Sequence, residues 1–330
     1  MKDPVNKVSN FKFGTGTTQY QRLHPALLPE NAPIHGMSLS ELMAYSVAYS
    51  QNLVYYNEKN QPDGYWSDFL LSDISFILST IISLNLEKLD LEFNEHVSRF
   101  YRANQKVQRL EATETIFEFI KGMALRLNTW RQQVNAISLP NSDIEYQVAF
   151  ELESIIQSQA GEDLRKLISY DLGAGAKGGL GSAVGLSYKE FGEIWESEGV
   201  APVNIFLGDR MEEQYNRAMA NIRLVYRSFL NTLTYAKFNF EPYFQQALLQ
   251  KSDHKPHAAL LMAFLSTLDK AQGDLNHVSD RYLKFYYENY LQLFPATSVP
   301  DTAHLCFDLA DHVDSMLLRK GAKLQSEGTN

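Results

Sequence analysis

The residues best suited to chemistry form a glycine-rich stretch, "LGAGAKGGLGSAVG", which contains six of the chain's 18 glycines between Gly173 and Gly185. A phosphate-binding loop has the spacing G-x-x-x-x-G-K-[ST] and joins a strand to a helix. Here Lys177 is followed by Gly178, and the preceding segment is helical in pattern. The G-x-G-x-x-G fingerprint needs a βαβ unit, which the surrounding sequence does not predict. We therefore predict a flexible surface loop over residues 172–187 rather than a phosphate site.

The histidines could in principle bind zinc. His254 and His257 are three residues apart, but Pro256 lies between them. His304 and His312 flank a strand-like pattern. A catalytic zinc site needs three protein ligands in a defined geometry, and no third ligand is evident, so no metal site is predicted.

Acid–base and nucleophilic chemistry find no clear candidates either. The acidic pairs Glu151/Glu153 and Glu212/Glu213 fall on helix faces that are expected to be solvated. Cys306 lies in a strand-like pattern, where a cysteine is more often part of the core than a nucleophile. The G-x-S-x-G elbow is absent from the sequence. We predict no catalytic residue and no cofactor.

Composition indicates a soluble globular protein. The chain has 330 residues, of which 45% are hydrophobic and 21% are charged. A net charge of −9 argues against nucleic-acid binding, which needs clustered Lys and Arg. The longest uncharged apolar run, Ile74–Leu86, is shorter than the roughly 20 residues of a membrane span. With one cysteine and no signal-peptide pattern, the sequence predicts a cytoplasmic protein.

The first part of the chain divides into an extended arm and a helical region. Residues 1–37 contain Gly, Thr, Asn and several prolines, which predict an extended arm. Ser38 and Glu41 form a capping box that starts a helix reaching to about Glu58. A second helix is expected from about Trp66 to Leu84, and helices continue to residue 295.

Two long seams of apolar residues are the clearest structural signal. Their members repeat at steps of four and three residues, the spacing of helices packed lengthwise in bundles. The seams are Ile116, Ile120, Met123, Leu127, Trp130 and Val134, and Met211, Tyr215, Ala218, Ile222, Val225 and Phe229. A further helix is predicted over 143–170, and another, starting at Pro256, passes a joint at Gly273. The predicted fold class is mainly α, an elongated helical bundle.

The pattern changes to alternation near the end of the chain. "TAHLCFDLA" alternates apolar and polar residues, as a half-buried strand does. "MLLRKGAKL", at 316–324, is a second strand-like run that is broken at Gly321. We predict that residues 296–330 begin a β domain that continues beyond this chain or pairs with a partner.

The aromatic run "RYLKFYYENYL", at 281–291, is the sharpest local feature. Its aromatic side chains are spread around more than half of a helix, which indicates contact on two sides. Packing within the core is one interpretation, and a Tyr-rich subunit interface is the other.

Two segments resemble a known family. "GTTQYQRLHPALLPENAPIHGMSLSELMAYSVAYSQNLVYYNEKNQPDGYWSDF" and "HKPHAALLMAFLSTLDKAQGDLNHVSDRYLKFYYENYLQL", the latter followed by "VPDTAHLCFDLA" and "LLRKGAKL", are similar to the N-terminal part of baseplate J-like wedge proteins of bacterial contractile injection systems. The matching residues are about 14–69 and 254–324, and the middle of the chain resembles no family.

The resemblance implies a structural role without catalysis. Such wedge proteins assemble with a second wedge subunit, in six-fold units around the hub and spike, and connect to sheath-initiating proteins. The partner wedge subunit is an alternative, and a helical ligand-binding or enzymatic domain that uses the glycine-rich loop is another. The resemblance implies candidate subunit contacts at Thr17, Gln19, Arg22, Pro25, Leu27, Asp63, Trp66, Tyr282, Phe285, Tyr286, Tyr287 and Tyr290.

Overall fold

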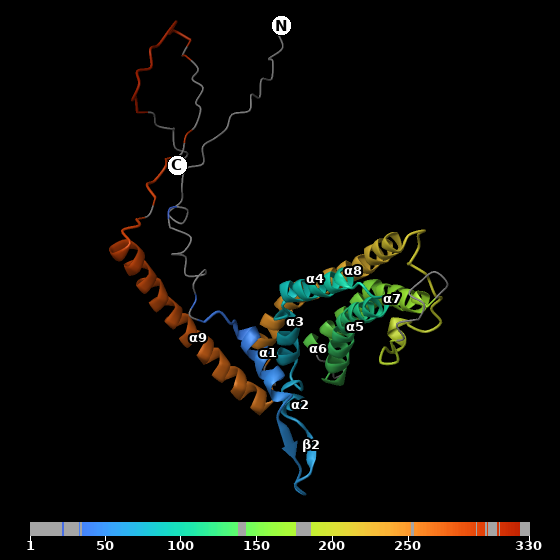
Figure 1. The fold of residues 1–330 in the computed structure, drawn as a ribbon. Helices are drawn as coiled ribbons and strands as arrows, with labels where there is room; N and C mark the ends of the chain where they lie inside the picture. Colours follow the sequence, from blue (N-terminus) through green and yellow to red (C-terminus); the bar gives the residue numbers. More distant parts are fainter. Residues whose placement is uncertain are drawn as a thin grey trace. The chain divides into compact units, whose positions relative to one another are not determined.

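The fold is mainly α-helical, as predicted (Figure 1). The computed structural model describes residues 22, 33, 35–137, 143–175, 186–251, 254–294, 296–300, 302, 309 and 311–323. The chain divides into two units, one formed by Gly36–Gln272 and the other by Met1–His35 with Gly273–Asn330.

The larger unit is a bundle of helices with one small hairpin. Its elements are α1 (Leu39–Ser50), β1 (Val54–Tyr56), β2 (Pro62–Tyr65), α2 (Trp66–Leu70), α3 (Ile74–Ile82), α4 (Leu86–Arg102), α5 (Lys106–Ile137), α6 (Asp143–Ile155), α7 (Gly161–Ala174), α8 (Met211–Gln250) and the start of α9 (Pro256–Phe285). Helix α3 packs against α1 and α8, and α5 packs against α4, α6 and α8. The two-stranded sheet is formed by β1 and β2.

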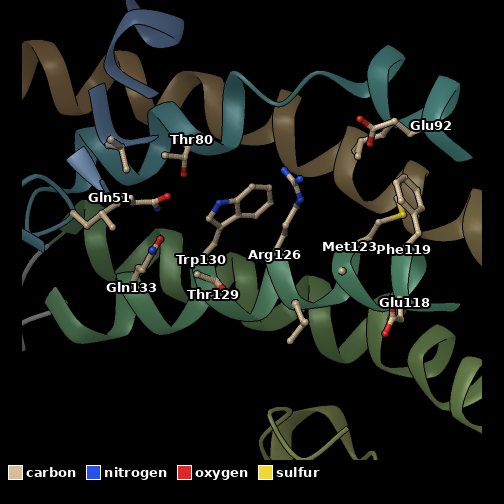
Figure 2. Close-up of a pocket in the computed structure, with 15 residues that line it drawn as sticks. Gln51, Thr80, Glu92, Glu118, Phe119, Met123, Arg126, Thr129, Trp130 and Gln133 are labelled. Carbon is tan, nitrogen blue, oxygen red and sulfur yellow. The ribbon is translucent and has the colours of Figure 1, made fainter. Parts of the chain in front are cut away.

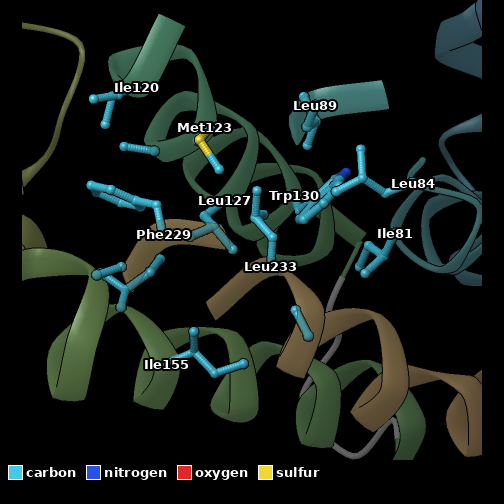
Figure 3. Packing of buried hydrophobic residues seen from close by; sticks show 14 of the residues in the cluster. Ile81, Leu84, Leu89, Ile120, Met123, Leu127, Trp130, Ile155, Phe229 and Leu233 are labelled. Carbon is cyan, nitrogen blue, oxygen red and sulfur yellow. The ribbon is translucent and has the colours of Figure 1, made fainter. Parts of the chain in front are cut away.

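Both predicted seams lie in the core. Every residue of the α5 seam is buried, and Figure 3 shows Ile120, Met123, Leu127 and Trp130 among the side chains that fill it. The α8 seam is buried from Tyr215 to Phe229. Its first member, Met211, is exposed because it is the first residue of α8, where the helix has just begun.

The first predicted helix ends earlier than expected. The capping box of Ser38 and Glu41 is present, but α1 stops at Ser50 instead of reaching Glu58. The chain then forms the β1–β2 hairpin. The aromatic and β-branched residues that follow Asn52 favour a strand once a turn returns the chain to pair with them.

The second predicted helix, over 66–84, is two helices. Helix α2 ends at Leu70, and Asp73 caps the start of α3 by accepting a hydrogen bond from the backbone N–H of Ser75 at 3.0 Å. A side-chain cap of this kind competes with a continuous helix, so the break lies at the aspartate.

Helix α4 lies within the predicted helical region, but its bounds were not predicted, although its sequence carries a clear pattern. Asn85 caps its first turn by accepting from the N–H of Lys88 at 2.8 Å. Four apolar residues at steps of four, four and three are buried against the rest of the bundle: Leu89, Phe93, Val97 and Phe100.

The helix predicted over 143–170 is present, with an irregular turn inside it. Helices α6 and α7 are joined by a π-helical turn, Ile156–Ala160. Helix α7 continues to Ala174, three residues into the predicted 172–187 loop. A Cβ on Gly173 would lie 2.0 Å from the carbonyl oxygen of Val203. Gly173 therefore allows α7 to approach a neighbouring backbone, while residues 176–185 of the loop, Lys177 among them, lie outside the described residues.

Helix α9 begins at Pro256, as predicted, and runs without a break through Gly273, where a joint was expected. In the smaller unit, the side chain of Asn276 forms two hydrogen bonds with the backbone of His35. The His35 N–H donates to Asn276 Oδ1 at 3.2 Å, and Asn276 Nδ2 donates to the His35 carbonyl at 3.1 Å. This pair joins the end of the predicted arm to α9.

The second strand-like run is not a strand over its described residues, 316–323. Gly321 has a φ of +90° in a turn, which fits the predicted break. Leu317 and Leu318 are exposed, because no described strand lies beside them to form a sheet. The first run, at 302–310, lies almost wholly outside the described residues.

The buried carboxyl of Asp163 makes stability depend on pH. Burial raises the pKa of Asp163, and a hydrogen bond from Ser228 and the charge of Lys166 offset this only in part. Asp163 Oδ2 has no hydrogen-bond partner among the described residues. The folded state favours the neutral carboxyl of Asp163. The contribution of this carboxyl to the free energy of unfolding is therefore fully present below its pKa in the unfolded chain, about 3.9. It is lost as the pH rises through its pKa in the folded protein.

Asp163→Asn should therefore raise the free energy of unfolding at pH 7, by on the order of 1 kcal/mol. The gain should shrink as the pH is lowered towards 4, which chemical denaturation at several pH values measures. Glu162→Gln is the control with the opposite sign, because a hydrogen bond from Lys166 lowers the pKa of Glu162. This account would be contradicted if the stability gained by Asp163→Asn over the parent protein were smaller at pH 7 than at pH 4.

Candidate protein-interaction site

The stretch "YYNEKNQPDGYWSDF", at 55–69, is a motif within the first segment that resembles wedge proteins, and it forms most of the β1–β2 hairpin and the start of α2. Asn57 builds the turn, because its Oδ1 accepts hydrogen bonds from the N–H groups of Lys59 and Gln61 at 3.0 and 3.1 Å. Asn60 takes a φ of +54°, a conformation that asparagine tolerates. At the other end, the N–H of Trp66 donates to the carbonyl of Leu53 at 2.9 Å and closes the hairpin.

The glycine of the motif makes room for a tyrosine ring. Gly64 pairs with Tyr55 across the strands and has a φ of +144°. A Cβ at Gly64 would lie 2.7 Å from a ring carbon of Tyr55. The Tyr55 ring lies over the glycine and contacts Phe69 of α2, with ring centroids 4.9 Å apart. This contact fixes the inner face of the hairpin.

The outer face of the hairpin is apolar and exposed. Val54 and Tyr56 alternate with Tyr55 along β1, and Tyr65 is paired with Val54. All three are exposed, Tyr56 by 59%. A shift in register between Tyr55 and Tyr56 leaves Asp63 as an extra residue of β2, exposed beside this face. We call Val54, Tyr56 and Tyr65 the hairpin face.

An apolar hollow of about 600 Å³ lies at the base of the hairpin. Trp66, a residue predicted to make subunit contacts, forms part of its wall and is 52% exposed. Its ring packs on Phe69, with centroids 5.5 Å apart. The other lining residues come from α1, the segment before β1, α2 and α9: Tyr45, Ser46, Tyr49, Ser50, Leu53, Leu70, His257 and Leu261.

The two histidines considered for zinc instead tie the beginning of α9 to the bundle. His257 Nε2 donates to the carbonyl of Phe69 at 2.9 Å. His254 Nδ1 lies 2.9 Å from Oδ2 of the buried Asp73, whose other oxygen caps α3. His312 is exposed, and His304 lies outside the described residues.

The aromatic run at the end of α9 is not packed into a core. Tyr282, Phe285 and Tyr290 are each more than 60% exposed, Tyr286 is 40% exposed, and Tyr287 is half-buried. The chain forms a π-helical turn at Tyr286–Tyr290, in which the rings of Tyr286 and Tyr290 stack with centroids 5.4 Å apart. The core interpretation of this run is wrong for these residues, because their rings remain on the surface. We call them the α9 aromatic end.

The arm residues carry less information. Arg22 is half-buried, and its carbonyl accepts from the N–H of Ala296 at 2.9 Å. The other arm contacts implied by the resemblance, Thr17, Gln19, Pro25 and Leu27, lie outside the described residues.

One member of each acidic pair lies beside an arginine. Glu153 lies 3.6 Å from Arg131, and Glu213 lies 2.6 Å from Arg217. Throughout the described ranges, no group of three or more His, Cys, Asp or Glu side chains is arranged to hold a metal ion. Each helix in the same ranges is too short or too polar to cross a lipid bilayer.

No protein-family model matches the chain, and no curated protein matches it significantly. The resemblance to wedge proteins therefore rests on the sequences of residues 14–69 and 254–324 alone.

Gly64→Ala should destabilise the hairpin by about 1–3 kcal/mol, because the new Cβ combines a strained φ with a collision against the Tyr55 ring. Hydrogen exchange of the Asn57 and Trp66 amides, which the hairpin protects, measures the effect. Gly199→Ala is the matched control, since Gly199 also has a positive φ but no atom within 4 Å of a Cβ. Adding Tyr55→Ala to Gly64→Ala should relieve the collision. Equal exchange in Gly64→Ala and the parent protein would show that the ring does not require the glycine.

Proposed function

We propose that this protein is a structural wedge component of the baseplate of a contractile injection system. The observation that carries the proposal is the exposed hairpin face beside the apolar hollow. The proposed role is assembly without catalysis.

The hairpin face has the properties of a protein-binding surface. A two-stranded sheet alone is marginally stable in water and gains from a further packing partner. Val54, Tyr56 and Tyr65 are exposed together, next to a hollow whose wall includes Trp66. Clustered exposed aromatic side chains are enriched at protein interfaces and dominate their binding energy.

The α9 aromatic end is a second surface of the same kind. Its exposed rings are followed along the chain by Leu293 and Phe294, which are exposed as well. Both surfaces fall in the segments that resemble wedge proteins, 14–69 and 254–324. The middle of the chain, which resembles no family, supplies the buried seams of α5 and most of α8. The location of both surfaces in the matching segments supports a role in which these segments contact other subunits.

The partners implied are the second wedge subunit, the sheath-initiating protein and the hub and spike proteins, in a six-fold assembly formed in the cytoplasm. The chain could instead be that second wedge subunit, which would use the same surfaces against its J-like partner. Neither role requires a nucleic acid. The net charge of −9 also disfavours binding to a nucleic acid.

Deleting the gene in the producing organism should remove assembled sheathed particles, as judged by electron microscopy of cell lysates. The parent gene should restore them. Tyr56→Ser with Tyr65→Ser should not restore them, because the hairpin face loses two aromatic contacts, each of which can contribute about 2 kcal/mol or more at an interface.

Phe238→Ser is the matched control, because Phe238 is exposed on α8 outside both surfaces. It should restore particles fully. Particles that form normally without this chain would refute the wedge role. Particles restored by the tyrosine double variant would refute the hairpin face as a contact.

A further inference from the structure

A second pocket, of about 520 Å³, lies within the larger unit between α5 and the helices α1, α3 and α4 (Figure 2). Pockets of this size that combine an apolar body with a few polar groups are typical of small-molecule sites. Neither the hairpin face nor the α9 aromatic end contributes to it. It is therefore independent of the surfaces proposed for assembly.

The inner wall of the pocket is apolar. Trp130, Met123 and Leu89 line it and are otherwise buried in the core. Figure 2 shows the Trp130 ring extending from α5 into the space below Thr80 of α3. A flat indole surface at this position can pack against the flat or aliphatic body of a ligand.

Arg126 supplies the charge. Its side chain lines the pocket one helical turn before Trp130, and the two extend from α5 in the same direction in Figure 2. Among the described residues, Arg126 has no ion-pair or hydrogen-bond partner. In contrast, Arg99, Arg165 and Arg217 each pair with a glutamate. An unpaired guanidinium beside an apolar wall is suited to a carboxylate or sulfonate, which it binds through two parallel hydrogen bonds.

Gly122 lines the pocket one helical turn before Arg126. It lies in the middle of α5, where glycine costs about 1 kcal/mol relative to alanine. A Cβ built on Gly122 would have no atom within 4 Å, so close packing does not require the glycine. A larger side chain there would instead fill space beside Met123, which also lines the pocket.

We propose that this pocket binds a small organic acid with a flat apolar body, its acidic group on Arg126 and its body on Trp130. Two acidic residues also line the pocket, and they determine the orientation. Glu118 is eight residues from Arg126, about 12 Å along the helix, and Glu92 lies 3.8 Å from Lys88. Figure 2 shows both at the end of the pocket away from Gln51 and Gln133. The ligand body therefore extends towards these two amides and away from the carboxylates.

The chain's three tryptophans allow a site-specific test by 19F NMR of the full chain labelled with 5-fluorotryptophan. Trp130 reports on this pocket, Trp66 reports on the apolar hollow, and Trp195 is fully buried. The probes are 1-anilinonaphthalene-8-sulfonate and its uncharged relative N-phenyl-1-naphthylamine. The sulfonate should shift the Trp130 signal saturably and bind about tenfold or more tightly than the uncharged probe, as expected for one charged hydrogen-bonded contact.

Arg126→Gln should abolish the preference for the sulfonate. Arg227→Gln, at an exposed arginine of α8 outside the pocket, should leave it unchanged. Gly122→Leu should leave the Trp130 shift unchanged with both probes, because Gly122 lies one turn before Arg126, on the side of the pocket away from the ligand body.

A saturable Trp130 shift whose preference for the sulfonate depends on Arg126 would support the proposal. A Trp130 signal that neither probe moves would overturn it. Equal affinity for the two probes, or a shift confined to Trp66, would overturn it as well, because the acid would then not be recognised at Arg126.

Discussion

The larger unit depends on the burial of one continuous apolar seam along α5. Residues from Ile116 to Val134 occur at steps of four and three, so a single face of the helix must be covered along five turns. Helices α4, α6 and α8 provide that cover, and α3 reaches it as well. Because α5 is surrounded on several sides, it fixes where its neighbours lie. The hairpin, the apolar hollow and the second pocket are all carried by helices placed in this way.

Most of the core comes from the middle of the chain, whereas both exposed surfaces come from the segments on either side of it. The hairpin face comes from a short segment in which Gly64 and Asn57 determine the backbone, and the Tyr55 ring uses the space that the glycine leaves. The residues that resemble wedge proteins thus include those that shape this hairpin. A motif can therefore have a specific structural reason even where its side chains have no catalytic role.

The predictability of each feature follows from how local its cause is. The seams of α5 and α8 were predicted because the spacing of apolar residues within a helix determines which face is buried. The hairpin was not predicted, because Val54–Tyr56 forms a strand only when the turn at Asn57 brings the chain back to pair with it. The sequence of this segment is also compatible with a helix. Helix α4 could have been found from Asn85 and its apolar spacing. The pocket could not, because the empty space beside Gly122 is defined by side chains from four helices.

The pair between His35 and Asn276 joins positions 241 residues apart. Synthesis proceeds from the N-terminus, at about 5–20 residues per second, so the backbone of His35 emerges well before Asn276 exists. During that interval the bundle built around α5 can already fold, since α1 to α8 precede Asn276 in the chain. The smaller unit can only form afterwards, by closing a loop whose interior is already compact, which reduces the entropy lost on closure. The order of synthesis thus allows the larger unit to fold before the smaller one.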